Sequence, residues 1–463
     1  MARSSASVVL ALDIGSSSVR SALFRETGAR ILRSGASRKY AMRYSSDGGA
    51  ELDPQVVLRA TRTCVAETRS TARNAHAIAI SGSAFWHGLL GVDAKGVPLT
   101  PIYMWADTRS AGEAANMRRQ LSERKIQLRT GCLLRAPFWP AKLAWLERRD
   151  VARWLSPAAW IFEQLFGVAG TSDSMASGTG LYNWRTRSWD EELCRLVAVP
   201  IDKLGAIENA EQTTFTAIGD GAASNLGSGA DNKRKLAINI GTSAAVRAII
   251  PRRLLSPARL PHGFFRYVVD QERDVIGGAV SNAGNLRSWC MRELRIRDDA
   301  EAERALSRSA AAEDALTVLP FWVEERAPTW PENLHGAIAG VRQVTSAADV
   351  LRVTTTAVYY RLAAIADELE AALGRSTEII VSGGILHSPA SLDILADALG
   401  RDIRVCSEME SSLRGAARYA LEHLGYRVAP LRNGKLIRHR PSLAAKHRDR
   451  RARQEEVERR LSR

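Results

Sequence analysis

A strand-turn-strand motif occurs twice in this chain, 226 residues apart. Residues 11–24 read ALDIGSSSVRSALF and residues 237–250 read AINIGTSAAVRAII, with five identical positions. In each copy an apolar run ends at a glycine that is followed by small hydroxyl residues. This pattern predicts a buried strand and a tight turn whose backbone amides can approach a phosphate closely. The sequence therefore predicts two phosphate-binding turns, one at Gly15 to Ser18 and one at Gly241 to Ser243.

A second repeat follows the first in the same order. Residues 77–83 (AIAISGS) resemble residues 378–384 (EIIVSGG), and each segment comes after a stretch with helical spacing, at about 54–72 and 346–373. Chance is the alternative explanation, because such hairpins are common and SGG also occurs in ordinary strand-to-helix turns. Two repeats in one order favour a duplication. We therefore expect two related halves whose turns face a shared cleft.

Length and composition indicate an ordinary globular protein. A chain of 463 residues suits two domains of about 200 residues each. The first apolar run contains Asp13 and leads into the turn, so we expect a core strand there and no signal peptide. No stretch approaches the length of a membrane span. The five cysteines have no CxxC spacing, which predicts reduced thiols, a cytoplasmic location and no zinc site.

The net charge of +15 is concentrated at the C-terminus. Residues 427–463 hold 13 Lys and Arg against 4 Asp and Glu, which leaves only +6 for the preceding 426 residues. Such a tail attracts polyanions at low salt, but its composition is typical of a disordered segment or a solvated helix. We therefore predict a domain at 1–230, a second at 231–426 with the boundary near 229–235, a disordered tail at 427–463, and no specific nucleic-acid partner.

Residues 142–166 are rich in tryptophan, with Trp145, Trp154 and Trp160, and their sequence indicates a helix. We expect one helical stretch whose indole rings pack against another helix. These tryptophans are therefore predicted to belong to the core and not to a cofactor site.

Two carboxylates, Asp220 and Asp13, lie at positions that suit catalysis and metal binding. Asp220 lies in IGDGAASN, where flanking glycines would let a substrate come within about 3 Å of the carboxylate and where the helix that follows would point its N-terminus at an anion. Asp13 ends the first strand beside the first turn, a position that suits magnesium, which prefers oxygen ligands. Its repeat partner Asn239 is uncharged. One carboxylate and two turns predict a single magnesium-nucleotide site.

Further polar candidates follow strand ends in the first half. His87, Trp105, Asp107 and Arg109 occupy positions where ligand-binding groups gather in open α/β sheets. The alternatives are a structural role for His87 beside Trp86, and for Trp-x-Asp-x-Arg an exposed ion pair that starts the next helix.

From Val8 to Gly425 the sequence resembles the FGGY family of carbohydrate kinases, within the actin, hexokinase and heat-shock chaperone ATPase superfamily, and most of all its gluconate kinases. The resemblance rests on an ordered set of motifs: ALDIGSSSVRSALF, SAFWHGLLGVD with MWADTRS, TSDSMASGTGLYNW with WDEEL, IGDGAASNLGSGA with INIGTSAAVR, IGGAVSNAGNLRSW, ERAPTW and IIVSGGILHSP. Ser16 replaces the usual threonine and keeps the hydroxyl. Between Leu204 and Thr216 the chain lacks a segment that family members use to approach the catalytic loop.

The resemblance implies two RNase H-like α/β domains around an interdomain cleft. It also implies transfer of the γ-phosphoryl group of ATP to a hydroxyl of a sugar or sugar acid, with magnesium and with Asp220 as the general base. The implied sugar pocket contains His87, Trp105, Asp107 and Arg109. The implied nucleotide site contains Gly15, Ser16, Ser17, Ser18, Gly241, Thr242, Ser243, Gly284, Ser288, Gly383, Gly384 and Ser388, with Asp13 facing the metal.

D-gluconate, or a similar open-chain sugar acid phosphorylated at its terminal hydroxyl, is the substrate that the resemblance favours. Its carboxylate needs cationic or hydrogen-bonding partners in a closed cleft, and Arg109 with His87 would supply them. In the alternative interpretation Arg109 only orients Asp107, and a neutral sugar would serve equally well.

A non-catalytic relative that binds sugar or nucleotide as a sensor is the second functional hypothesis. The shortened stretch before Asp220 and the basic tail favour it, whereas the intact Asp13, Asp220 and hydroxyl-rich turns favour an enzyme. The expected partners are a sugar or sugar acid and ATP, without membrane or nucleic acid. The oligomeric state stays open between a monomer and a homodimer.

Overall fold

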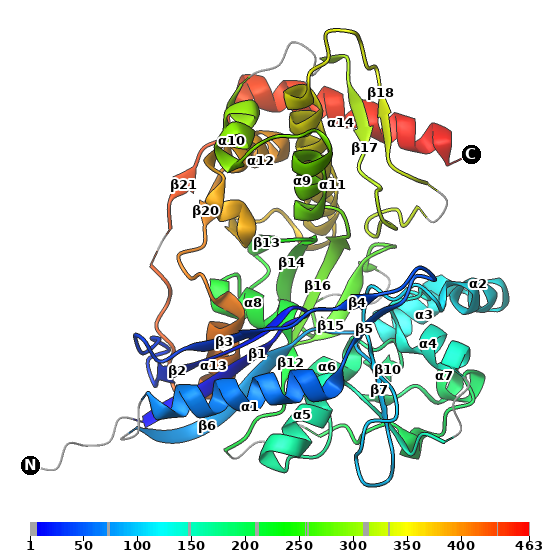
Figure 1. The fold of residues 1–463 in the computed structure, drawn as a ribbon, viewed down its shortest axis with the longest axis vertical. Helices are drawn as coiled ribbons and strands as arrows, with labels where there is room; N and C mark the ends of the chain where they lie inside the picture. Colours follow the sequence, from blue (N-terminus) through cyan, green and yellow to red (C-terminus); the bar gives the residue numbers. More distant parts are fainter. Residues whose placement is uncertain are drawn as a thin grey trace, which may run out of the picture.

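Two β-sheets, one from each half of the chain, form the framework of the protein in a computed structural model (Figure 1). The structure describes residues 7–462 except 72–74, 147–149, 209–212, 255, 257–258, 309–313, 332–333 and 433. The buried apolar side chains form a large core around each sheet, and a third core lies beside the first sheet.

The first sheet has five strands in the order β12-β6-β1-β2-β3: β12 (Ile218–Gly219), β6 (His76–Ala84), β1 (Ser7–Ile14), β2 (Ser18–Arg25) and β3 (Ala36–Lys39). β1 forms an antiparallel hairpin with β2 and pairs in parallel with β6. Helix α1 (Pro54–Ser70), which packs against β2 and β3, is capped by the Asp53 side chain and has proline at its first position. These are the signals that predicted it.

The second sheet has seven strands in the order β15-β16-β14-β13-β19-β20-β21: β15 (Phe265–Val268), β16 (Arg273–Val280), β14 (Ala244–Pro251), β13 (Lys235–Ile240), β19 (Glu378–Ser382), β20 (Ile403–Val405) and β21 (Leu436–Ile437). β13 pairs antiparallel with β14 and parallel with β19. The long helix α11 (Ala347–Leu373) precedes β19, as α1 precedes β6. The predicted repeat of hairpin, helix and parallel strand is therefore confirmed.

Strand register refines the alignment of the two halves. Asp13 lies opposite Ser83, whose hydroxyl donates to its carboxylate, and Asn239 lies opposite Ser382, whose hydroxyl accepts from its amide at 3.0 Å. The sequence alignment had paired Ser382 with Ser81 instead. A β-bulge between Val8 and Val9 changes the register of β1 against β6 by one residue and so accounts for one of the two residues of this shift. The duplication thus extends to a side-chain contact beside each turn.

The remaining helices complete the two halves: α2 (Ala111–Gln120), α3 (Glu123–Thr130), α4 (Trp139–Leu146), α5 (Pro157–Phe166), α6 (Asp173–Ser177), α7 (Glu191–Leu196), α8 (Asp220–Ser228), α9 (Gly284–Glu293), α10 (Asp299–Ser307), α12 (Pro389–Leu399), α13 (Ser411–His423) and α14 (Pro441–Leu461). Short strands form the smaller sheets: β4 (Arg43–Tyr44), β5 (Ala50–Leu52) with β8 (Ile102–Tyr103), β7 (Leu90–Val92) with β9 (Arg153–Leu155), β10 (Tyr182–Asn183) with β11 (Ser188–Trp189), and β17 (Thr317–Leu319) with β18 (Ala337–Ala339).

Helix α13 comes late in the chain but packs against the first half. It packs against β1, β6 and α8 (Figure 1), and its apolar side chains belong to the core of the first sheet. Small residues permit this close approach, because a Cβ atom added at Gly227 would lie 1.7 Å from the Ser411 carbonyl oxygen and one at Gly415 would lie 1.8 Å from that of Ala223. A division of the chain at residue 230 therefore assigns α13 to the second half, although α13 packs in the core of the first half.

Residues 142–166 do not form the single helical stretch that we predicted. α4 ends at Leu146, β9 pairs with β7, and a new helix, α5, starts after the Ser156 cap with Pro157 at its first position. The Ser-Pro pair was a start signal for a helix. The expectation that Trp154 and Trp160 are core residues agrees with their burial at 2% and 1% exposure.

The last part of the C-terminal segment is a helix, which corrects the predicted disordered tail. Residues Pro441–Leu461 form α14, which packs against α11, α12 and β17 and buries Ala444, His447, Gln454 and Glu458 (Figure 1). Composition misled the prediction, because the many arginines of this helix pair with acidic side chains, as Arg451 does with Asp367. Among the described residues, no helix is long and apolar enough to cross a membrane, and all five cysteines are buried free thiols.

Candidate active site

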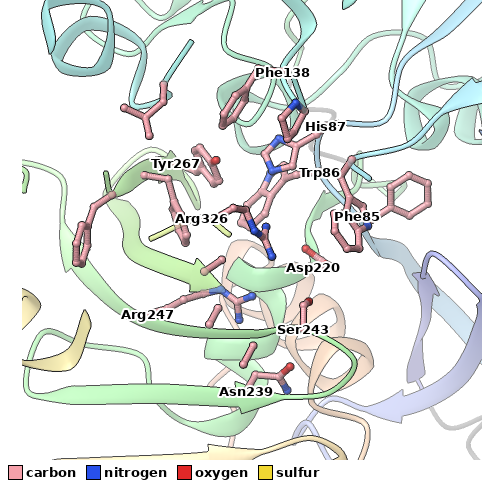
Figure 2. A pocket seen from close by; sticks show the side chains of 18 of the residues that line it. Phe85, Trp86, His87, Phe138, Asp220, Asn239, Ser243, Arg247, Tyr267 and Arg326 are labelled. Atoms are coloured by element: carbon pink, nitrogen blue, oxygen red, sulfur yellow. The ribbon is translucent and has the colours of Figure 1, made fainter. Parts of the chain in front are cut away.

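A cavity of about 190 Å³ lies where the two halves meet (Figure 2). Ser16 from the first turn and Ser243 from the second both line it, so the two turns do face a shared cleft. Its walls are largely aromatic, with Phe85, Trp86 and Trp105 from the first half and Tyr267 from the second. Its charged lining residues are Asp220, Arg247 and Arg326.

Asp220 occupies the first position of α8, directly after the short strand β12. The amide of Gly221 donates to its carboxylate at 2.7 Å. Burial raises the pKa of Asp220, and the charge of Arg247 opposes that shift. A carboxylate with a raised pKa that faces a cavity can accept a proton from a ligand. The segment before it is anchored despite its shortness, because Ile80 of β6 exchanges backbone hydrogen bonds with Thr213 and Phe215.

The glycines beside Asp220 have a different role from the one predicted. A Cβ atom at Gly219 would lie 1.8 Å from the Trp86 indole, and one at Gly221 would lie 2.7 Å from it. The indole nitrogen of Trp86 donates to the Ser174 carbonyl at 3.0 Å, so the ring is fixed. The glycines therefore make room for Trp86, and Asp220 faces the cavity.

Asp13 lies at the end of β1, close enough to Asp220 for their charges to interact. Burial, and less strongly the charge of Asp220, raise the pKa of Asp13 to about 6, although the hydrogen bond from Ser83 opposes the shift. Two carboxylates that repel each other beside the first turn are compatible with a divalent cation, which takes oxygen ligands. Among the described residues, no group of three or more His, Cys, Asp or Glu side chains could hold a metal ion.

His87 and Trp105 line the cavity, as predicted from their positions after strand ends. His87 donates from Nδ1 to the Gly178 carbonyl at 2.6 Å, and burial lowers its pKa to about 3. The ring is therefore neutral and offers Nε2 as an acceptor. The buried Lys142 ties the two segments together, since its Nζ donates to the carbonyls of His87 at 2.9 Å and Met104 at 2.8 Å.

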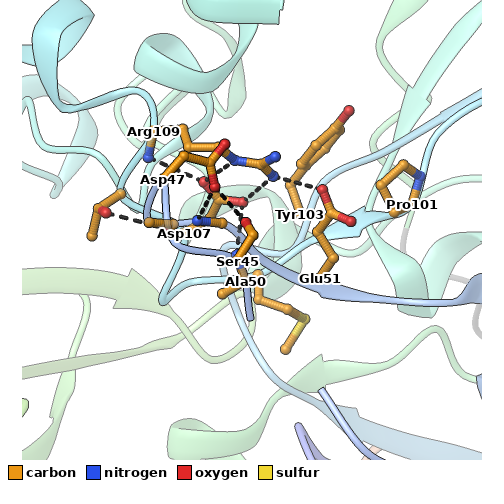
Figure 3. Close-up of polar contacts among 12 residues, drawn as sticks. Ser45, Asp47, Ala50, Glu51, Pro101, Tyr103, Asp107 and Arg109 are labelled. Atoms are coloured by element: carbon orange, nitrogen blue, oxygen red, sulfur yellow. Dashed lines mark hydrogen bonds and ion pairs between the residues drawn. The ribbon is translucent and has the colours of Figure 1, made fainter. Parts of the chain in front are cut away.

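Asp107 and Arg109 do not line this cavity, which corrects their predicted place in the sugar pocket. Arg109 donates to both oxygens of Asp107 and to Glu51 at 2.7 Å (Figure 3). Its guanidinium also lies over the rings of Tyr103 and Trp145. Asp107 accepts in addition from the amide of Ala50, on β5. The motif thus forms a mostly buried structural network that connects β5 with the segment after β8.

Arg247 and Arg326 are the cavity cations that sequence reasoning missed. Both guanidinium groups point toward Asp220 in Figure 2, and burial lowers the pKa of each. Arg326 donates to Ser281 at 3.0 Å and to the Val280 carbonyl at 3.1 Å, whereas Arg247 donates no hydrogen bond to any described residue. The motifs INIGTSAAVR and ERAPTW contained these arginines, but nothing in their local pattern showed that they meet.

A second cavity, of about 810 Å³, lies in the C-terminal half. Six of the residues predicted for the nucleotide site line it: Gly241, Thr242, Gly284, Ser288, Gly384 and Ser388. Thr355 and Tyr359 of α11 line it as well and were not predicted. The Thr355 hydroxyl is buried without a hydrogen-bond partner among the described residues.

Four predicted nucleotide residues line neither of these cavities: Gly15, Ser17, Ser18 and Gly383. Gly15 closes the first turn by donating its amide to the Ser18 carbonyl at 2.9 Å. Gly383 has a φ of 93°, and a Cβ atom there would lie 2.5 Å from the Ile240 carbonyl oxygen. Gly383 is therefore required for the close approach of its loop to β13.

The second turn connects the two cavities. Thr242 lines the larger cavity, Ser243 lines the smaller one, and Gly241 closes the turn through a 2.9 Å hydrogen bond to the Ser243 carbonyl. A ligand in either cavity therefore reaches the same turn. This arrangement suits the transfer of a phosphoryl group between a large and a small ligand.

Comparison with protein families agrees with this arrangement. Residues 8–230 match the N-terminal domain, and residues 236–422 the C-terminal domain, of the FGGY family of carbohydrate kinases. The chain belongs to this family. The resemblance that the motifs indicated is therefore confirmed. FGGY kinases are phosphotransferases that use ATP as the phosphoryl donor.

Curated FGGY kinases of three substrate classes, gluconokinases, glycerol kinases and xylulose kinases, are similar to the chain. A gluconokinase from Bacillus subtilis is 28% identical, with 89% of this chain and 86% of the relative covered. A glycerol kinase from Gloeobacter violaceus is 29% identical, with 88% and 86% covered. The crystal structure of a gluconate kinase from Lactobacillus acidophilus superposes with a TM-score of 0.89 at 22% identity, covering 99% of both chains. The two-domain actin- and hexokinase-type fold of FGGY kinases is therefore confirmed.

Proposed function

We propose that this FGGY kinase phosphorylates a sugar acid, D-gluconate or a similar open-chain acid, at its terminal hydroxyl. The observation that carries the proposal is the pair of arginines in the smaller cavity. Arg247 and Arg326 face one carboxylate, Asp220, in that lining. Glu325 lies outside the lining and accepts hydrogen bonds from Ser281 and Asn282. The lining side chains alone therefore carry one positive charge in excess, and the carboxylate of Glu325 interacts with Arg326 from outside the lining.

An excess cation in a partly buried cavity favours an anionic ligand. A buried guanidinium without hydrogen-bond partners is unfavourable unless a ligand supplies them. A carboxylate matches the planar donors of arginine and forms charge-assisted hydrogen bonds. Because gluconokinases and glycerol kinases are similarly identical to this chain, the choice of substrate depends on these arginines and not on overall similarity.

The remaining cavity residues suit phosphoryl transfer. Asp220 would take the proton of the sugar hydroxyl as the hydroxyl oxygen bonds to the γ-phosphorus of ATP, and ADP would leave. The second turn would hold the phosphates between the cavities through Thr242 and Ser243, and Ser16 would approach them from the opposite half. Asp13 would hold magnesium, directly or through water, and the ion would neutralise the phosphate charge.

A coupled assay of ADP release tests the proposal. Catalytic efficiency should be higher for gluconate than for xylulose and glycerol. Arg247→Gln should lower the efficiency for gluconate about 100-fold, because a charged hydrogen-bonding partner is lost, and should change the efficiency for glycerol much less.

Arg109→Gln is the matched control, because Arg109 lies outside the cavity. It should leave the ratio of gluconate to glycerol efficiency unchanged. A higher efficiency for xylulose than for gluconate would refute the sugar-acid assignment. Binding of gluconate and ATP without any ADP release would instead support the non-catalytic hypothesis.

A further inference from the structure

The C-terminal helix α14 reaches the loop that carries Arg326. The loop at residues 325–330 also places Trp330 in the wall of the smaller cavity. α14 lies beyond residue 422, where the match to the family domain ends. The last turns of this helix contact the loop at Thr329, which does not line the cavity.

Three side chains make this contact. Glu458 of α14 pairs with Arg361 of α11 at 2.7 Å, and the exposed fractions of the two side chains are only 7% and 5%. Thr329 donates its hydroxyl to the other carboxylate oxygen of Glu458. Arg361 donates in turn to the Thr329 hydroxyl at 2.9 Å and to the Ala327 carbonyl at 3.1 Å. The ion pair therefore holds the loop at Ala327 and at Thr329.

The cavity side of the loop has its own contacts. Arg326 is fixed by Ser281 and the Val280 carbonyl, and the Trp330 indole donates to the Gly263 carbonyl at 2.8 Å. Arg361 and Glu458 bind the stretch between these two residues through the Ala327 carbonyl and the Thr329 hydroxyl. A shift of that backbone would move Arg326 relative to Arg247 and Asp220.

The buried ion pair is sensitive to the loss of one partner. Removing one partner from a buried pair leaves the other charge without compensation. If Glu458 is lost, Arg361 is expected to move, and the loop backbone that it binds at Ala327 would follow. If the Thr329 hydroxyl is lost, the loop loses its own hydrogen bonds to Glu458 and Arg361.

We propose that Glu458, Arg361 and Thr329 are positioning residues for the substrate cavity, so that α14 takes part in sugar binding through Arg326 and Trp330. This inference rests on the proposed function in one respect, the assignment of the smaller cavity to the sugar. The nucleotide cavity is lined by other residues, so the effect should be confined to the sugar.

Thr329→Val and Thr329→Ser test the inference on the full-length enzyme with its best sugar substrate. Thr329 is an exposed residue apart from its hydroxyl contacts, so both variants should fold. Thr329→Val should raise KM for the sugar about tenfold, as for the loss of a hydrogen bond to a charged group, with KM for ATP unchanged. Thr329→Ser keeps the hydroxyl and should behave as the wild type.

Glu458→Gln should raise the same KM. Glu456→Gln is its control on α14, because Glu456 pairs only with Arg459 and Arg460 among the described residues. An unchanged sugar KM in Thr329→Val, or equal shifts for sugar and ATP, would overturn the positioning role. If the wild type turns over no sugar, the proposed function fails. In that case, binding of gluconate measured by calorimetry still tests the positioning role, which requires weaker binding in Thr329→Val.

Discussion

Asp220 combines burial, a neighbouring cation and a place at the start of a helix. Its raised pKa has burial as the main cause, and Arg247 moderates it. We expect Asp220→Asn to lower kcat by a factor of roughly 100 or more, because the proton acceptor is lost. Nucleotide affinity, measured by calorimetry, should change little. Near-normal turnover in this variant would remove Asp220 from the role of general base.

Asp13 should make stability depend on pH. Its pKa is about 6 in the folded protein and near 3.8 without the fold, so the unfolded chain releases this proton first. The contribution to stability is therefore present below about pH 4 and is lost as pH rises through about 6. Partial exposure of the side chain reduces the effect.

Asp13→Asn should consequently raise Tm at pH 7.5 without magnesium by at least about 2 °C, and the gain should vanish near pH 4. Magnesium with ADP should stabilise the wild type more than the variant. A variant with the same Tm difference at both pH values would contradict the role of the ionised carboxylate.

Local sequence was sufficient for some site residues and not for others. Asp13 and Asp220 were predictable because Asp13 lies at the end of a strand beside the Gly15 turn and Asp220 directly follows a strand between two glycines. Arg247 and Arg326 were not, because the loop that carries Arg326 is bonded to β16, which pairs with β14, and these segments are distant in sequence. Arg109 was placed wrongly for the same reason, since its partner Glu51 lies in another strand.

At the scale of elements, periodicity and caps predicted α1 and α11 and the strands beside them. Local sequence patterns gave wrong predictions for elements whose structure depends on contacts with distant residues. α14 is stabilised by buried Glu458 and His447 and by ion pairs to other elements, none of which its composition could reveal. The break between α4 and α5 depends on the pairing of β9 with β7, a contact between distant segments.

The turn between β13 and β14 should separate the binding of the two ligands. Thr242→Val should raise KM for ATP about tenfold and leave KM for the sugar unchanged, because Thr242 lines only the larger of the two cavities described. Ser243→Ala should affect steps at the sugar side, with a fall in kcat. Steady-state kinetics with each substrate varied in turn measures both effects. Equal KM shifts for ATP and sugar in both variants would contradict this division.

The whole molecule depends on α13 to close the core of its first half. A fragment of residues 1–230 should therefore lack a cooperative thermal transition, because the face of β1 and β6 that α13 covers would be open to water. Adding residues 405–426 through a flexible linker should restore a transition in circular dichroism. A cooperative transition of the fragment alone would support 1–230 as an independent domain, as its boundaries were predicted.

The return of α13 to the first sheet also has a consequence for biosynthesis. Domains of multidomain proteins generally fold in order as they leave the ribosome. Here the N-terminal half cannot finish its core until the ribosome has released residue 423, the end of α13. During most of translation the nascent chain therefore exposes an apolar surface that chaperones can bind, and its two halves complete their folding almost together.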